Sequence, residues 1–201
     1  MSTEFNRRIY FSGVWKTTRY KGVPVYKYPT DLWMLHEIIS ETAPEVVVET
    51  GTAEGGSALY LWDQGCEVIT IDVRKPGRRF PSGITFIQSD SLEAADQVGD
   101  MIQGRRTMVV LDSDHRPEHV TREIASYAPM VTPGCYLVVE DTGVDVYRLM
   151  DAPEEDYPHG GPGKALQGSR GLLAVLGFEV DPSRERFGLT MNPGGWWRRR
   201  P

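Results

Sequence analysis

The chain has 201 residues, 40% hydrophobic and 25% charged, and its 28 acidic residues against 22 Lys or Arg give a formal net charge of −6. An acidic chain lacks the sequence-wide positive field that attracts a phosphate backbone, so nucleic acid is not an expected partner. The length and apolar fraction suit one globular domain with a sizeable core, and they exclude disordered and collagen-like chains.

Two further classes are excluded by what the chain contains. No run approaches the roughly 18–20 apolar residues of a membrane-spanning helix, and residues 1–10 contain no apolar signal core. Cys66 and Cys135 are too few and too far apart for a disulfide framework or a cysteine zinc site. We therefore expect a cytoplasmic protein that is not attached to a membrane, with both cysteines buried as small apolar side chains.

Residues 28–44 predict an amphipathic helix. Their apolar side chains recur at helical spacing from Leu32 to Ile39, and Thr30 or Asp31 is placed to cap the start.

From residue 46 onward, strand-like and helix-like segments alternate. Strands are expected at 46–49, 66–72, 84–90, 107–112 and 135–141, and helices at 57–65, 91–103, 117–131 and 164–177. Such alternation is typical of an α/β fold with a doubly wound, parallel sheet.

The C-terminal part differs from this pattern. Residues 178–192 predict two short strands joined by a turn at 182–184, and Trp196 and Trp197 are expected to close the edge of the sheet. A final hairpin on a parallel sheet fits the class I methyltransferase variant of the fold, in which the last strand runs antiparallel.

Carboxylates stand at the end of every expected strand between residues 46 and 141. They are Glu49, Asp72, Asp90, Asp112, Glu140 and Asp141. Each one alone could be a helix cap or a turn residue. Open α/β sheets bind ligands beyond the carboxyl ends of their strands, so together these acids indicate a ligand crevice in which a cation or hydrogen-bond donors offset their repulsion.

A glycine-rich loop follows the first of these strands and leads into a helix, as in nucleotide-binding sites. Asp72 lies 21 positions after Gly51, where an acid can accept hydrogen bonds from both ribose hydroxyls of NAD or of S-adenosylmethionine. Glu49 would repel a pyrophosphate but suits the cationic amino-acid end of S-adenosylmethionine, and Asp90 could hold an adenine amino group. The expected cofactor contacts are Glu49, Gly51, Thr52, Gly55, Gly56, Ser57, Asp72, Asp90, Ser91 and Asp112.

The last two of these strand ends predict a metal site. Asp112, Glu140 and Asp141 offer hard oxygen ligands, which suit Mg²⁺ and also Mn²⁺ or Ca²⁺. A divalent ion there could hold a substrate oxygen and lower its pKa. His115 lies three residues after Asp112 and could take the proton, or could instead cap the next helix.

Several long motifs resemble the cephalosporin hydroxylase family. They occupy residues 20–39, 49–62, 68–73, 111–142 and 161–166. Members of that family are similar to class I, S-adenosylmethionine-dependent and metal-dependent O-methyltransferases of natural-product pathways such as antibiotic biosynthesis. The resemblance implies a Rossmann-like, mostly parallel seven-stranded sheet with an antiparallel last strand.

The resemblance also implies roles for individual residues. The glycine loop, the ribose acid Asp72 and the three metal acids fall on the positions named above, and His115 falls on the proposed base of related macrolide-sugar O-methyltransferases. Asp114 departs from the family's Asn or Gly and could be an extra metal ligand or a neighbouring acid.

We therefore predict an S-adenosylmethionine-dependent and Mg²⁺-dependent O-methyltransferase that acts on a hydroxyl or carboxylate of a small-molecule natural product, with catalytic residues His115 and Asp112. Residues 29–201 are expected to form the methyltransferase domain and residues 1–28 a segment for substrate binding or assembly. We expect a homo-oligomer, a dimer or larger. The alternatives are an NAD-linked oxidoreductase and a non-catalytic cofactor-binding helper of a biosynthetic enzyme.

Overall fold

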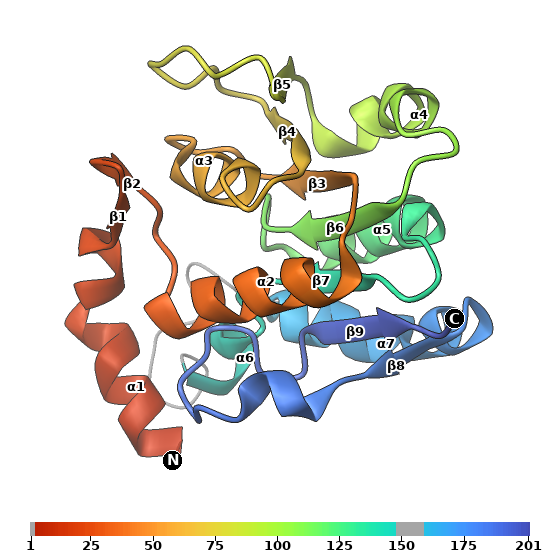
Figure 1. The fold of residues 1–201 in the computed structure, drawn as a ribbon. Coiled ribbons are helices and arrows are strands. Elements are labelled where there is room, and N and C mark those ends of the chain that lie inside the picture. The colour runs from red at the N-terminus through yellow and green to blue at the C-terminus, as the bar shows by residue number, and fades with distance from the viewer. Residues whose placement is uncertain (1–2, 148–158) are drawn as a thin grey trace.

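The main sheet of the protein has seven strands in the spatial order β5-β4-β3-β6-β7-β9-β8. The computed structural model describes residues 3–147 and 159–201. Strands β5, β4, β3, β6 and β7 run parallel, and β9 is antiparallel to both of its neighbours (Figure 1). The strands are β3 (Val46–Thr50), β4 (Glu67–Asp72), β5 (Ile84–Gln88), β6 (Thr107–Leu111), β7 (Tyr136–Val139), β8 (Phe178–Val180) and β9 (Trp196–Arg199).

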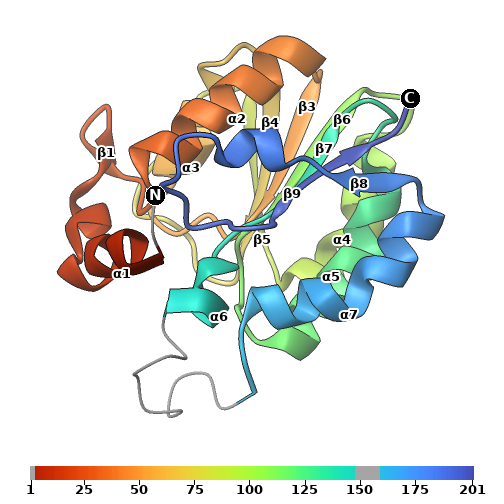
Figure 2. The same ribbon diagram turned by 90° about the horizontal axis from the view of Figure 1, so that it is seen from below.

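Helices cover both faces of this sheet. Figure 2 shows α2 and α3 on one face and α4, α5 and α7 on the other. Their bounds are α2 (Pro29–Thr42), α3 (Gly56–Trp62), α4 (Ser91–Met101), α5 (Pro117–Tyr127) and α7 (Pro162–Val175). Because both faces are covered, the central strands β3, β6 and β7 are buried along their whole length and consist mainly of Val, Leu and Met. The predicted doubly wound sheet with an antiparallel last strand is confirmed.

The C-terminal hairpin differs from the prediction. Its first strand is β8, but residues 182–185 form a short 3-10 helix, η3 (Pro182–Glu185), and the second strand is β9 rather than residues 185–192. The expectation that Trp196 and Trp197 close the sheet edge was wrong, since β9 lies between β7 and β8, and β8 forms that edge. Trp196 is fully buried and Trp197 is 7% exposed, so both indole rings bury apolar surface inside the sheet.

The start of α2 also differs from the prediction. The helix begins at Pro29 with Tyr28 at the N-cap, and no side chain caps it. Proline suits the first helical position because its missing N–H is not needed there. Asp31, one of the two expected caps, is instead buried and accepts a hydrogen bond from Met191 N at 2.8 Å.

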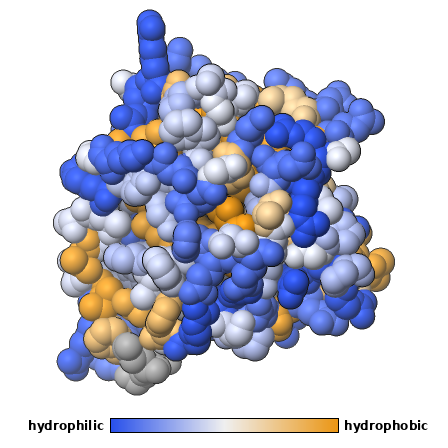
Figure 3. Space-filling view, viewed as in Figure 1, coloured by the Kyte–Doolittle hydropathy of each residue, from blue (hydrophilic) through white to orange (hydrophobic). Residues whose placement is uncertain are grey.

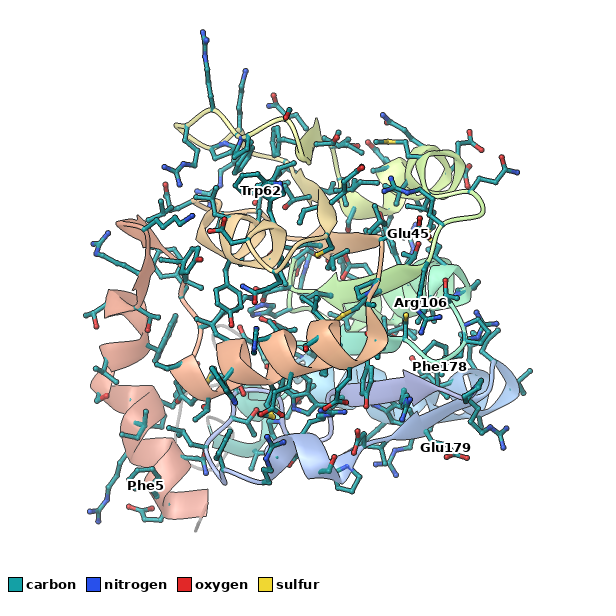
Figure 4. All side chains as sticks on the ribbon, in the orientation of Figure 1. Phe5, Glu45, Trp62, Arg106, Phe178 and Glu179 are labelled. Carbon is teal, nitrogen blue, oxygen red and sulfur yellow. The ribbon has the colours of Figure 1, made fainter. Side chains whose placement is uncertain are left out.

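The N-terminal segment lies beside the sheet. It contains α1 (Thr3–Ser12), a short 3-10 helix η1 (Val14–Thr17) and a two-stranded ribbon of β1 (Arg19–Tyr20) and β2 (Val23–Pro24). Helix α1 contacts the short helix α6 (Gly143–Tyr147), and Figure 3 shows apolar side chains gathered over α1 on this face. Phe5, which Figure 4 labels on α1, and Phe11 are exposed. The expected homo-oligomer stays a prediction.

The two ends of the parallel strands differ in chemistry. At the amino ends, Arg106 and Glu45 precede β6 and β3, and Arg106 N donates to the Glu45 carboxylate at 2.8 Å (Figure 4). At the carboxyl ends, the chain gathers the strand-end acids around a cavity. Among the residues described, no helix has the length and apolar character needed to cross a bilayer.

Candidate active site

A cavity of about 730 Å³ opens at the carboxyl ends of β3, β4, β6 and β7. Its walls come from the glycine loop, the strand-end acids and the N-terminal segment. The residues that line it include Trp15, Lys16, Tyr26, Gly51, Thr52, Gly56, Ser57, Asp72, Asp90, Ser91, Asp112, His115 and Asp141. The parallel sheet therefore brings most of the predicted site residues to one space.

The glycine loop between β3 and α3 is folded as only glycine permits at two positions. Gly51 and Gly55 have φ angles of 87° and 81°, in the left-handed region that other residues rarely adopt. A Cβ atom on Gly51 would lie 1.9 Å from the carbonyl oxygen of Asp112, and one on Gly56 would lie 2.1 Å from that of Pro24. The loop therefore packs closely between the residue that follows β6 and the N-terminal segment. This packing fixes the position of the loop backbone at the cavity wall.

Glu49 lies beneath this loop, fully buried inside β3. Its Oε2 accepts a hydrogen bond from the Thr70 hydroxyl at 2.7 Å, and its Oε1 is buried with no hydrogen-bond partner in the structure described here. Burial raises the pKa of Glu49 to about 7, although the charge of Lys27 opposes this effect. Glu49 does not itself line the cavity, so its contact with a cofactor stays a prediction.

Asp72 and Asp90 both lie on the cavity wall. Asp72 ends β4 and accepts hydrogen bonds from Ala53 N at 2.9 Å and Arg74 N at 2.8 Å, which tie it to the glycine loop. Asp90 is the N-cap of α4 and accepts from Leu92 N at 2.8 Å. The capping role considered for Asp90 is therefore present. Each carboxylate keeps lone pairs with which it could also accept from a ribose or an adenine.

Asp112, His115 and Asp141 converge on one point. Nε2 of His115 lies 3.5 Å from Asp112 Oδ1 and 3.3 Å from Asp141 Oδ2, and one potential ligand atom from each of the three residues lies within 4.8 Å of the others. Asp141 follows β7 in a left-handed conformation with a φ of 55°. Two of the three predicted metal acids thus face the predicted base.

The charges of the cluster raise the pKa of His115. Burial lowers it, but Asp141 and Asp112 outweigh burial and raise it to about 9. A divalent cation between the two carboxylates would offset this effect of their charge and favour the neutral imidazole that a base requires.

Sequence reasoning missed Lys27, which is 4% exposed. Its Nζ donates to Asp112 Oδ2 at 2.5 Å and to Glu140 Oε2, which is also buried. Burial lowers the pKa of Lys27, but the charges of Asp112 and Glu140 raise it well above its usual range. The one available signal was a lysine in the otherwise apolar run from Val23 to Tyr28.

Asp114 and His119 lie outside the group formed by Asp112, His115 and Asp141. Asp114 pairs with Arg116, accepting from its backbone N at 2.9 Å and its Nε at 2.7 Å. His119 lies 3.0 Å from the Ser91 hydroxyl, which places it beside the α4 end of the cavity. Asp114 is therefore not among the residues that converge with His115, and its expected role as an extra ligand stays a prediction.

Comparison with known proteins decides the family. The model of the family "Rhamnosyl O-methyltransferase/CmcI" matches residues 12–200. The chain belongs to this family. The resemblance to the cephalosporin hydroxylase family and the predicted O-methyltransferase class are confirmed.

Curated relatives in this family are rhamnosyl O-methyltransferases of mycobacteria. Those of Mycobacterium tuberculosis (strain H37Rv) and Mycobacterium leprae are each 29% identical over 98% of this chain, which spans 84% and 89% of their lengths.

Solved structures agree on the fold. An apo structure of CmcI has a TM-score of 0.65 at 20% identity and covers 92% of this chain and 77% of its own. A CmcI structure with Mg and SAM has a TM-score of 0.64 at 19% identity, covering 92% and 78%. MycE from the mycinamycin biosynthetic pathway, in complex with Mg and SAH, has a TM-score of 0.52 at 21% identity, covering 73% and 41%.

Proposed function

We propose that this chain transfers a methyl group from S-adenosylmethionine to a hydroxyl of a small-molecule natural product, with the help of a divalent ion such as Mg²⁺. One observation carries the proposal. A single cavity is lined both by the glycine loop with Asp72 and Asp90 and by the point at which Asp112, His115 and Asp141 converge. A cofactor and an acceptor oxygen could therefore meet in one space.

The glycine loop and the strand-end acids fit S-adenosylmethionine. Gly51 and Gly56 pack closely against the backbone of Asp112 and Pro24, and both glycines line the cavity, so the main chain of the loop lies at the cavity wall. Asp72 stands where it can accept from a ribose, and Ser91 and Asp90 stand at the end where an adenine would lie. Glu49 Oε1, which has no hydrogen-bond partner among the described residues, is a buried carboxyl acceptor next to this loop and would suit a ligand that carries a cationic amino group.

Asp112 and Asp141 fit a hard divalent cation. Glu140 was predicted as the third ligand. Its Oε2 accepts from Lys27, and its Oε1 is buried without a hydrogen-bond partner in residues 3–147 and 159–201. S-adenosylmethionine supplies the methyl group when bound, and a bound divalent ion lowers the pKa of the acceptor oxygen.

His115 would take the acceptor's proton at Nε2, the ring nitrogen that faces Asp112 and Asp141. The two carboxylates would stabilise the imidazolium that results and keep the ring in place. A carboxylate acceptor has no proton to lose, so this arrangement favours a hydroxyl.

The acceptor is proposed to be a sugar hydroxyl, because the curated relatives are named for a rhamnosyl substrate. Trp15, Lys16 and Tyr26 bring the N-terminal segment to the cavity, which supports the substrate-binding role predicted for residues 1–28. The sequence also offers the loop at 141–162 as a second part of the acceptor pocket, and residues 148–158 of that loop lie outside the part of the chain that the structure describes.

Titration calorimetry with S-adenosylhomocysteine tests the core of the proposal. We expect saturable binding, followed by methyl transfer to glycosylated acceptors that a chelator abolishes and Mg²⁺ restores. In this assay His115→Ala should lower kcat by about a hundredfold or more, and full activity in that variant would indicate methyl-ester formation instead. No binding of S-adenosylhomocysteine, or fluorescence enhancement on adding NADH, would reject the proposal.

A further inference from the structure

A basic segment follows β4 in this acidic protein, in the connection to β5 at the top of Figure 1. Residues 74–79 contain no acid and four cations, which are Arg74, Lys75, Arg78 and Arg79. None of these four side chains pairs with a carboxylate among the described residues. Arg116, another cation of the cavity wall, does pair with Asp114. The basic segment therefore keeps its positive charge available for a ligand.

The basic segment is held against the glycine loop. A Cβ atom on Gly55 would lie 2.6 Å from the ring of Phe80 and 3.3 Å from Cδ of Arg78. Phe80 packs against the hydrophobic core, and its ring centre lies 6.3 Å from that of Phe86 on β5. Pro76 within the segment is buried. These contacts fix the basic segment beside the loop that forms one wall of the cavity.

Two cations line the cavity without a carboxylate partner. Arg74 comes from the basic segment and Lys16 from the N-terminal segment. Asp72 accepts from the backbone N of Arg74 at 2.8 Å, so this contact does not use the guanidinium group. Nζ of Lys16 lies 5.3 Å from the centre of the Trp15 ring, and it forms no ion pair with a carboxylate in residues 3–147 and 159–201. Both charged groups are therefore available to a ligand in the cavity.

Arg78 adds an independent observation. Its Nη1 is buried and has no hydrogen-bond partner in the described part of the chain. A buried donor without an acceptor costs free energy, and a charged donor costs more than a neutral one. An anion bound beside the glycine loop would offset this cost, since guanidinium groups match the geometry of phosphate and carboxylate oxygens.

The cofactor and the divalent ion do not match these cations. S-adenosylmethionine carries a sulfonium and an ammonium group and only one carboxylate. The acids on the cavity wall suit both the cofactor and the ion. Cations that remain unpaired beside them favour a third ligand of negative charge, because complementary charge raises the rate of association and selects the partner.

We propose that Lys16 and Arg74 form an anion subsite of the acceptor pocket, so that the acceptor is a sugar derivative that carries a phosphate or carboxylate group besides the hydroxyl to be methylated. The rest of the basic segment would attract such an acceptor to the cavity. This inference rests on the proposed function, since it names the substrate class of the same cavity.

Titration calorimetry with three probes tests the subsite on the full chain saturated with S-adenosylhomocysteine. Glucose 1-phosphate carries a phosphate, glucuronate carries a carboxylate and methyl glucoside carries no charge. We expect at least one anionic probe to bind about tenfold or more tightly than methyl glucoside. This binding should persist when EDTA replaces Mg²⁺, because side chains of the protein hold the anion.

Three exposed cations provide the variants. Arg74→Met and Lys16→Met should each weaken binding of the anionic probe about tenfold, because each removes one charge-assisted contact. Lys75→Met is the matched control, since it removes the same charge from the basic segment at a side chain that does not line the cavity. It should change this binding by less than about twofold. All three variants should bind S-adenosylhomocysteine as the unsubstituted protein does.

Three outcomes would overturn the inference. The anionic probes could fail to bind more tightly than methyl glucoside, or could bind only when Mg²⁺ is present. Lys75→Met could weaken binding as much as Arg74→Met, which would indicate a general field suited to an acidic partner protein. Arg74→Met could weaken S-adenosylhomocysteine binding equally, which would assign Arg74 to the cofactor's carboxylate. A failure of the proposed function would look different, because the unsubstituted protein would then not bind S-adenosylhomocysteine at all.

Discussion

Two buried cations lie at opposite ends of the same sheet, and their surroundings differ. At the amino ends, Arg184 of η3 donates to Glu41 of α2, to Asp181 and to the Tyr136 hydroxyl, and it is 7% exposed. Every guanidinium nitrogen of Arg184 has a partner. This cluster joins α2, β7 and the C-terminal hairpin, and its polar groups are satisfied.

At the carboxyl ends, Lys27 is as buried as Arg184 but leaves the acids around it incompletely satisfied. Glu49 Oε1 and Glu140 Oε1 are buried without hydrogen-bond partners in the described part of the chain. Buried polar groups are normally paired, and unpaired acceptors cost free energy. The fold therefore satisfies the polar groups around Arg184 at the amino ends of the strands and leaves buried acceptors around Lys27 at the carboxyl ends, where a ligand could use them.

The largest expected effect comes from adding a side chain to the glycine loop, at the cavity end of the sheet. Gly51→Ala would place a methyl group 1.9 Å from the Asp112 carbonyl at a φ of 87°, so we expect a loss of ~3 kcal/mol or more in unfolding free energy. Gly177→Ala, at a φ of 83° near β8 with no atom within 4 Å, should cost only about 1 kcal/mol. Urea unfolding of both variants measures the difference, and equal losses would contradict the packing described for the loop.

An intermediate effect is expected from substituting Glu49. Glu45, which immediately precedes the same strand β3, provides the control. Glu49→Gln should weaken S-adenosylhomocysteine binding roughly tenfold at pH 8, because a neutral amide would replace the carboxylate that is predicted to lie near the cofactor's cationic end. Its stability should be unchanged or higher, since burial disfavours the charged form. Glu45→Gln should change neither quantity. Calorimetry and thermal melting measure both, and an unchanged affinity in Glu49→Gln would remove Glu49 from the site.

The last expected effect is in the pH dependence of stability. Burial raises the pKa of Asp31 to about 7, so the folded state favours its protonated form and loses stability as pH rises from about 4 to 7. Asp31→Asn should flatten the stability profile over this window. The pKa of Asp181 is lowered instead, because hydrogen bonds from Ser183 and Tyr136 outweigh burial, and the stability it contributes is lost as pH falls below about 4.

Asp181→Asn serves as the contrasting variant, and it should flatten the profile only at acidic pH. Urea unfolding at several pH values follows both variants. A profile for Asp31→Asn that matches that of the unsubstituted protein between pH 4 and 7 would show that Asp31 does not titrate there.

The strand-end acids were predictable because of chain geometry. Parallel strands of one sheet end at the same edge, so Glu49, Asp72, Asp112 and Asp141 were expected near one crevice, and the cavity does gather three of them on its wall. Residues without a local signal were not predictable. Trp196 was wrongly assigned to the edge, because the position of its strand depends on pairing with β7, whose partner residues lie 58 to 62 positions earlier in the chain, and no local pattern reports such pairing.

The sequence alone determined the alternation of strands and helices, the glycine loop and the family, since these depend on local periodicity, turn chemistry and contiguous motifs. Only the tertiary structure decided which acid meets which cation. Lys27 is 85 residues from Asp112 and 113 from Glu140, and its partners follow from the packing of the N-terminal segment on the glycine loop. A buried charge selects its partner by proximity in the folded state, and sequence separation carries no record of that choice.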